Sequence, residues 1–77
     1  MNNYKNILKR DISMKENKLM RLNKKQNEQL TILDVIDHET QEKTYFTEIK
    51  KLENIQEQME LTQFELDELR DELGELE

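Results

Sequence analysis

The sequence predicts an all-α fold, an antiparallel helical hairpin of coiled-coil type. No Gly or Pro interrupts residues 1–73, apolar residues recur at alternating steps of three and four in both halves, and the halves carry opposite net charge. Gly and Pro most often end helices, and a three-four repeat keeps one apolar stripe facing a partner helix. We expect one domain over residues 1–77, with helices over about 3–36 and 43–74 and a turn near 37–43.

The first helix is predicted from a seam that polar residues interrupt. Lys15, Gln26 and Gln29 occupy positions that the repeat assigns to the core. Polar side chains at core positions lower stability and can fix register or partner number. The two glutamines therefore indicate either an alignment signal or a locally loose coil. The apolar members of this seam are Leu8, Ile12, Leu19, Leu22, Leu33 and Ile36.

The second helix carries the more regular seam, in which Thr62 is the one polar member and Leu76 the last apolar one. Gly74, the single glycine, lies where a C-terminal helix cap is expected. We therefore predict a frayed end over residues 75–77. The predicted core members of this half are Leu52, Ile55, Met59, Leu66, Leu69 and Leu73.

The charge distribution favours a chain that folds back on itself. Residues 1–38 carry eight basic and five acidic side chains, net +3, whereas residues 39–77 carry four basic and thirteen acidic ones, net −9. If opposed residue numbers sum to about 81, the two seams meet. The same alignment predicts five charge pairs: Lys9–Glu72, Arg10–Asp71, Asp11–Arg70, Arg21–Glu60 and Lys24–Glu57. Exposed pairs contribute only about 0 to 1 kcal/mol each. We therefore expect the ion pairs to select the register and the burial of leucines to stabilise the fold.

Two other topologies fit the same pattern. Residues 37–43 lack the Gly expected at a tight reversal, so a long continuous helix in an antiparallel coiled-coil dimer would make the same contacts between chains. In addition, residues 30–35 read as a capping box with a hydrophobic staple, which would start a helix at Thr31. The connection would then lie at residues 24–29.

No arrangement of residues typical of an enzyme is present in the sequence. His38 is the only histidine, and the segment 38–42 lacks the second histidine of the H-E-x-x-H zinc motif. There is no cysteine, no nucleophile paired with a base, no Gly-rich phosphate loop and no calcium loop. We expect no catalysis, no metal, no cofactor and no small-molecule substrate.

The sequence predicts a cytoplasmic protein without membrane contact. The first ten residues hold only Ile7 and Leu8 as an apolar pair, and no stretch approaches the length of a membrane span. The lack of cysteine suits a reducing compartment. Richness in Asn, Lys, Ile and Glu without Ala suggests an A/T-rich genome, such as that of a low-GC bacterium or a phage.

Large apolar residues outside the two seams form the candidate interface, because a two-helix hairpin cannot cover them. Dimerisation of two hairpins into a four-helix bundle would bury these residues. A surface for a different protein is the second interpretation, and both can hold together. The residues are Ile7, Met14, Met20, Phe46, Leu61 and Phe64.

These patterns predict a non-catalytic protein–protein interaction module, a small bacterial or phage regulator, inhibitor or adaptor that docks through a helix face. Alternatively, an acidic run could imitate nucleic-acid phosphates and occupy a basic site on another protein. A structural scaffold or assembly spacer is a third hypothesis. The net charge of −6 argues against direct nucleic-acid binding. The candidate mimic face consists of Glu65, Asp67, Glu68, Asp71 and Glu72.

Overall fold

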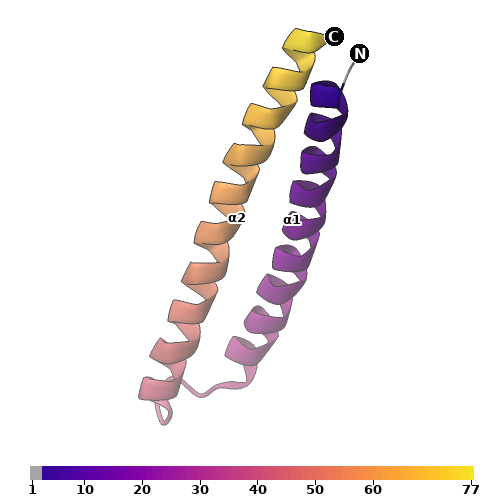
Figure 1. Ribbon diagram of the computed structural model, residues 1–77. Helices are drawn as coiled ribbons and strands as arrows, with labels where there is room; N and C mark the ends of the chain where they lie inside the picture. Colours follow the sequence, from indigo (N-terminus) through magenta and orange to yellow (C-terminus); the bar gives the residue numbers. More distant parts are fainter. Residues whose placement is uncertain (1–2) are drawn as a thin grey trace.

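Two long antiparallel α-helices make up the computed structural model, which describes residues 3–77 (Figure 1). Helix α1 spans Asn3–Val35 and α2 spans Glu42–Leu76. Measured over Cα atoms, the hairpin extends 62 Å by 15 Å by 13 Å. Both described chain ends lie at one end of the hairpin and the connection lies at the other. The predicted all-helical fold with two packed helices is confirmed, and the helix bounds differ from the expected ones by at most two residues.

The connection over residues 36–41 reverses the chain without glycine. The Asp37 carboxylate accepts a hydrogen bond from the Glu39 N–H at 2.9 Å, and the Asp37 carbonyl accepts one from the Gln41 N–H at 2.8 Å. The reversal uses no left-handed torsion angle, since no non-glycine residue of the described chain has a positive φ. The hydrogen bond from Glu39 is also the main reason why the pKa of Asp37 is lowered. Because the chain reverses between the two helices, the alternative of one continuous helix is wrong.

The alternative connection at residues 24–29 is also wrong, because these residues are helical within α1. Thr31 does not cap a helix N-terminus. Its hydroxyl donates to the Asn27 carbonyl at 3.0 Å, a contact with the preceding turn of the same helix. The capping-box pattern thus occurs in the middle of α1.

The core is one seam of side chains between the two helices. In heptad notation both seams occupy positions a and d, and at a register sum of 81 each a position of one helix meets a d position of the other. The residue numbers of the five cross-helix side-chain contacts within residues 3–77 sum to 76, 77, 80, 82 and 86, values that scatter on both sides of 81. The contacts are Tyr4–Glu72, Gln29–Glu48, Lys15–Glu65, Lys5–Glu77 and Glu16–Arg70. Six residues are buried: Leu8, Ile12, Leu22, Gln29, Thr62 and Leu66. The remaining predicted core residues are half-buried: Leu19, Leu33, Ile36, Leu52, Ile55, Met59, Leu69 and Leu73.

The C-terminal end of α2 differs from the prediction. The helix continues through Gly74, whose φ is not positive, and ends at Leu76, where the Glu77 N–H donates to the carbonyls of Leu73 and Gly74. The predicted cap at Gly74 and frayed end are therefore wrong, because a glycine also accepts helical torsion angles. Leu76 is 50% exposed, since it is the last residue of the helix. Neither described helix is both long and apolar enough to cross a membrane.

Candidate interaction surface

Four ion pairs connect charged side chains in residues 3–77, and three of them join the two helices. Lys15 Nζ lies 2.9 Å from Glu65 Oε2, Arg70 Nη2 lies 3.5 Å from Glu16 Oε2, and Lys5 Nζ lies 3.6 Å from Glu77 Oε1. The fourth, Lys51–Glu48, lies within α2. None of the five charge pairs predicted from the sequence forms within the described chain. The five predicted pairings are therefore wrong.

The geometry of an antiparallel coiled coil explains the difference. Position e of one helix faces position e of the other, and position g faces position g, on opposite sides of the core seam. Glu16 and Arg70 are both at e, and Tyr4, whose hydroxyl donates to the Glu72 carboxylate, is at g as Glu72 is. Lys24 and Glu57 are both at f, so they point away from each other. Matching residue numbers alone ignores this rotation about each helix axis.

Two long faces therefore flank the core seam. We define the g face as the g and c positions of both helices, and the e face as the e and b positions. All six residues of the predicted interface are exposed. Ile7, Met14 and Leu61 belong to the g face, Met20 and Phe46 to the e face, and Phe64 to the outer f position of α2. The structure thus exposes the whole set but distributes it over three sides of the hairpin.

The g face carries three further exposed apolar residues that sequence reasoning missed. They are Tyr4, Ile32 and Val35, with 52%, 43% and 78% of their surface exposed. Leu30 adds one such residue to the e face. Assigning every apolar residue a heptad letter would have found them, because residues that share a letter lie on one stripe. With them, the g face has six exposed apolar side chains.

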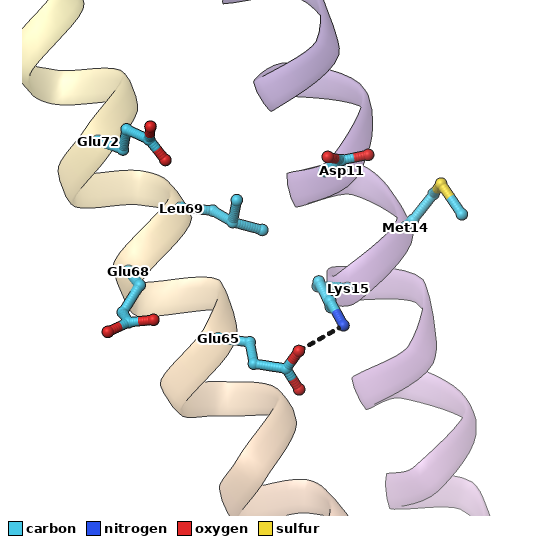
Figure 2. A pocket seen from close by; sticks show the side chains of 7 residues that line it. All are labelled: Asp11, Met14, Lys15, Glu65, Glu68, Leu69 and Glu72. Carbon is cyan, nitrogen blue, oxygen red and sulfur yellow. Dashed lines mark hydrogen bonds and ion pairs between the residues drawn. The ribbon is translucent and has the colours of Figure 1, made fainter.

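An acidic hollow of about 320 Å³ lies on the g face toward the chain ends (Figure 2). Four carboxylates and the Lys15 ammonium line it, with Lys15 joined to Glu65 across the helices. Leu69 points from α2 toward α1, whereas Met14 points away from α2. No group of three or more His, Cys, Asp or Glu side chains in residues 3–77 is arranged to hold a metal ion. The four acids are Asp11, Glu65, Glu68 and Glu72.

Basic residues occupy the g face nearer the connection. Lys18 and Arg21 line a second hollow beside Met14, and Lys25, Lys51 and Glu28 line another beside Ile32. The g face is therefore acidic toward the chain ends and carries a net positive charge from its middle to the connection, with Glu28 as an acid among the four cations.

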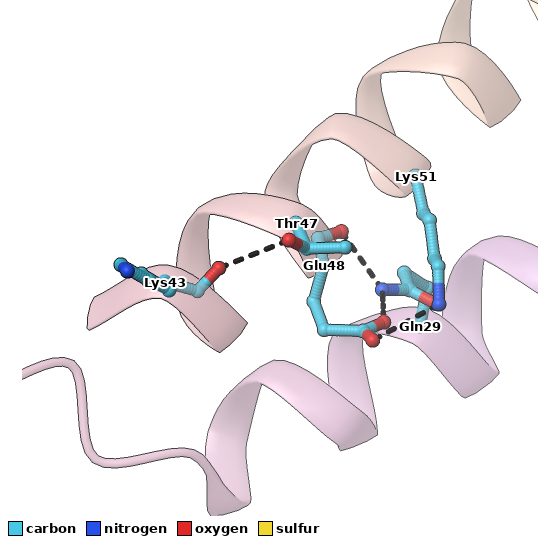
Figure 3. A network of polar contacts seen from close by, with 5 residues as sticks. All are labelled: Gln29, Lys43, Thr47, Glu48 and Lys51. Atoms are coloured by element: carbon cyan, nitrogen blue, oxygen red, sulfur yellow. Dashed lines mark hydrogen bonds and ion pairs between the residues drawn. The ribbon is translucent and has the colours of Figure 1, made fainter. Parts of the chain in front are cut away.

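A polar network crosses the core at Gln29 (Figure 3). Gln29 Nε2 donates to the Glu48 carbonyl oxygen at 2.8 Å and to Glu48 Oε2 at 2.6 Å, and Lys51 Nζ lies 3.0 Å from Glu48 Oε1. The hydrogen bond from Gln29, and after it the contact with Lys51, lower the pKa of the Glu48 carboxyl. Gln29 is only 7% exposed, so it is a satisfied core residue and not part of a loose coil. Glu48 extends the α2 seam closer to the connection than the sequence analysis assigned.

The candidate mimic residues do not share one face. Glu65, Glu68 and Glu72 lie on the g face, Asp67 lies on the e face, where it accepts a hydrogen bond from Gln63 at 2.9 Å, and Asp71 lies at f. A single flat surface cannot contact all five.

The single histidine lies in the connection and is exposed. Its ring packs against that of Tyr45, with 5.4 Å between ring centroids. This contact gives His38 a packing role at the start of α2.

Comparisons with known proteins add no functional assignment to this geometry. No protein-family model, no curated protein and no solved structure matches the chain.

Proposed function

We propose that the chain is a non-catalytic protein–protein interaction module that docks through apolar side chains on the faces of its hairpin. The observation that supports this function is the balance of apolar burial. In residues 3–77, four apolar side chains are buried and eleven large ones are exposed by 43% or more. Exposed large apolar residues that share one face mark interaction surfaces, and six of the eleven lie on the g face.

The thin core gives a physical reason for association. A two-helix hairpin buries little of its surface, and chains of this size gain stability from oligomerisation or a partner. Covering the g face or the e face would bury long apolar side chains such as Met14 or Phe46, which adds apolar area to the folded state. In this proposal the chain is a small cytoplasmic regulator, inhibitor or adaptor of bacterial or phage origin.

The acidic hollow on the g face supports a second candidate, occupation of a basic nucleic-acid-binding site on another protein. Asp11, Glu65, Glu68 and Glu72 line this hollow on a face with several apolar neighbours, and Lys15 pairs with Glu65 there. A mimic of this kind binds no duplex itself and displaces duplex from a basic protein, with an effect that weakens as salt rises. Retention of a labelled duplex by the chain would contradict both candidates.

Site-specific photocrosslinking in the cells that produce the chain tests the proposed function. A photoreactive residue is placed at Phe46, at Phe64 or at Met14, and the control is the same residue at Lys24, an exposed f position. We expect defined crosslinked products from at least one apolar position and none from position 24. Crosslinks that are absent or equal at all four positions would contradict an interaction module.

A further inference from the structure

We propose that the g face binds a second copy of this chain in reversed orientation, so that the acidic end of each hairpin lies on the basic part of the other. The inference rests on the proposed function and names the partner for one face. The dimer is closed by a two-fold axis across the hairpins near their middle. In this arrangement α1 lies on α1 of the partner copy and α2 on α2.

The apolar residues of the g face require a long partner. Tyr4 and Ile7 lie in the first two turns of α1, Met14 lies farther along, and Ile32 and Val35 lie in its last turns. These exposed side chains run along nearly all of a hairpin 62 Å long and 15 Å wide. A face of that size offers on the order of 900 Å² per partner, comparable with the roughly 800 Å² of a specific interface. A second hairpin matches this length from end to end.

The charges of the g face select the reversed orientation. Each residue of α2 can be given the number of the α1 residue that it faces, 81 minus its own number. On this scale the acidic hollow and Glu75 lie at levels 6 to 16. Levels 18 to 30 hold four cations and one acid: Lys18, Arg21, Lys25, Lys51 and Glu28. An axis near level 18 brings Asp11 of α1 to the level of Lys25 in α1 of the other copy, and Glu75 of α2 to the level of Lys51 in its α2, while Lys18 lies at the axis itself. That level is close to the midpoint of α1, so the helix ends also coincide. A parallel dimer would instead place acid on acid, which opposes association.

The e face lacks this self-complementarity. Its e and b positions carry acidic residues along the full length of the hairpin, and Lys9 and Arg70 are its only cations. With seven acids and two cations, each copy would bring a net charge of −5 to an interface formed by this face, which opposes association. The acidic members are Glu16, Asp34, Glu42, Glu53, Glu60, Asp67 and Glu77. The e face therefore remains for a partner of different sequence, whereas the g face fits its own copy.

The reversed dimer places Asp11 of one copy at the level of Lys25 of the other, twice by symmetry. Asp11→Lys leaves two lysines facing each other at both contacts, and Lys25→Asp leaves two aspartates. Mixing the two variants restores an attractive pair at both contacts. Only an orientation that brings position 11 to position 25 of the other copy gives this rescue.

Sedimentation equilibrium and native mass spectrometry of the full chain test the proposal. We expect a wild-type dimer, a dissociation constant raised about tenfold for each single variant, and recovery to near wild type in the mixture. Lys24→Asp makes the same charge change at an outward f position and should leave the dimer intact. Circular dichroism of each variant should show unchanged helix content, which separates lost association from lost folding.

Three results would overturn the inference: a wild-type monomer at all concentrations, a dimer insensitive to the charge changes, or a mixture no tighter than the single variants. A monomer that still photocrosslinks another protein through position 46 or 64 would contradict this inference and leave the proposed function intact. A monomer without any crosslink would contradict both.

Discussion

The side-chain amide of Gln29 in α1 donates to both the main-chain carbonyl and the carboxylate of Glu48 in α2, at 2.8 and 2.6 Å. An amide this buried costs free energy when it loses its acceptors. Sliding one helix along the other by a residue would move Glu48 away from the Gln29 amide. The pair therefore fixes the register at the end of the hairpin near the connection, where Gln29 interrupts the apolar seam.

The contribution of Glu48 to stability should depend on pH. Its folded pKa is lowered from the ordinary 4.5, chiefly by the hydrogen bond from Gln29 and then by Lys51. A carboxylate with a lowered folded pKa stabilises the fold fully above its unfolded pKa, and the contribution is lost as pH falls through the folded pKa. Thermal unfolding should show wild type more stable than Glu48→Gln at neutral pH. The difference should disappear in acid, below the ordinary glutamate range. Glu53→Gln removes an exposed carboxylate and is the control; a gap between wild type and Glu48→Gln that persists unchanged in acid would contradict the assignment.

Thr62→Val should stabilise the hairpin. Thr62 is 0% exposed and its hydroxyl oxygen has no hydrogen-bond partner. Burial of an unsatisfied hydroxyl costs about 1 to 3 kcal/mol, and valine has nearly the same shape, so the free energy of unfolding should rise by about 1 kcal/mol in urea titrations. Thr47→Val is the matched control, because the exposed Thr47 hydroxyl donates to the Lys43 carbonyl at 3.0 Å, and it should change stability by less than about 0.5 kcal/mol. A less stable Thr62→Val protein would show that the hydroxyl has a partner.

Gly74→Ala should also stabilise α2. Gly74 is helical, and an added Cβ would meet no atom within 4 Å. Alanine restricts the unfolded chain more than glycine does, which stabilises an exposed helical site by about 0.5 to 1 kcal/mol. Chemical denaturation followed by circular dichroism measures the change. Gly74→Pro should be destabilising, since proline disrupts the helix there. If alanine were neutral and proline tolerated, α2 would end before residue 74 in solution.

Double-mutant cycles should give a larger coupling free energy for a charge pair at e positions, beside the core seam, than for a pair at the outer f positions. Glu16 and Arg70 form an e–e ion pair, so we expect a coupling free energy of about 0.2 to 1 kcal/mol that weakens with added salt. Lys24 and Glu57 occupy f positions that point away from each other, and their coupling should be close to zero. The reverse order of coupling would mean that the helices are rotated about their axes relative to this structure.

The heptad repeat predicted the helices, the core seam and the register, because its period directly reflects which side chains share a helix stripe. The charge pairs were predicted wrongly because residues matched by number along the hairpin can point to different sides of their helices. Lys24 and Glu57 illustrate this, since both occupy outer f positions. The connection could not be read from composition, since the Asp37 carboxylate holds a reversal that glycine usually forms. The six residues predicted as an interface are all exposed, but the sequence analysis did not assign them to faces: Met14 and Phe46, for example, lie on different ones.

The adjacent chain ends give the hairpin a directional mechanical response. Lys5 and Glu77 form an ion pair at one tip, and the connection lies at the other tip. A load applied between residues 3 and 77 would pull the helices apart sideways and open the seam in sequence, starting with Leu8 and Leu73. A load between the connection and either chain end would act along the helix axes and shear every level of the seam together. The same contacts should therefore yield at a lower force in the first geometry than in the second.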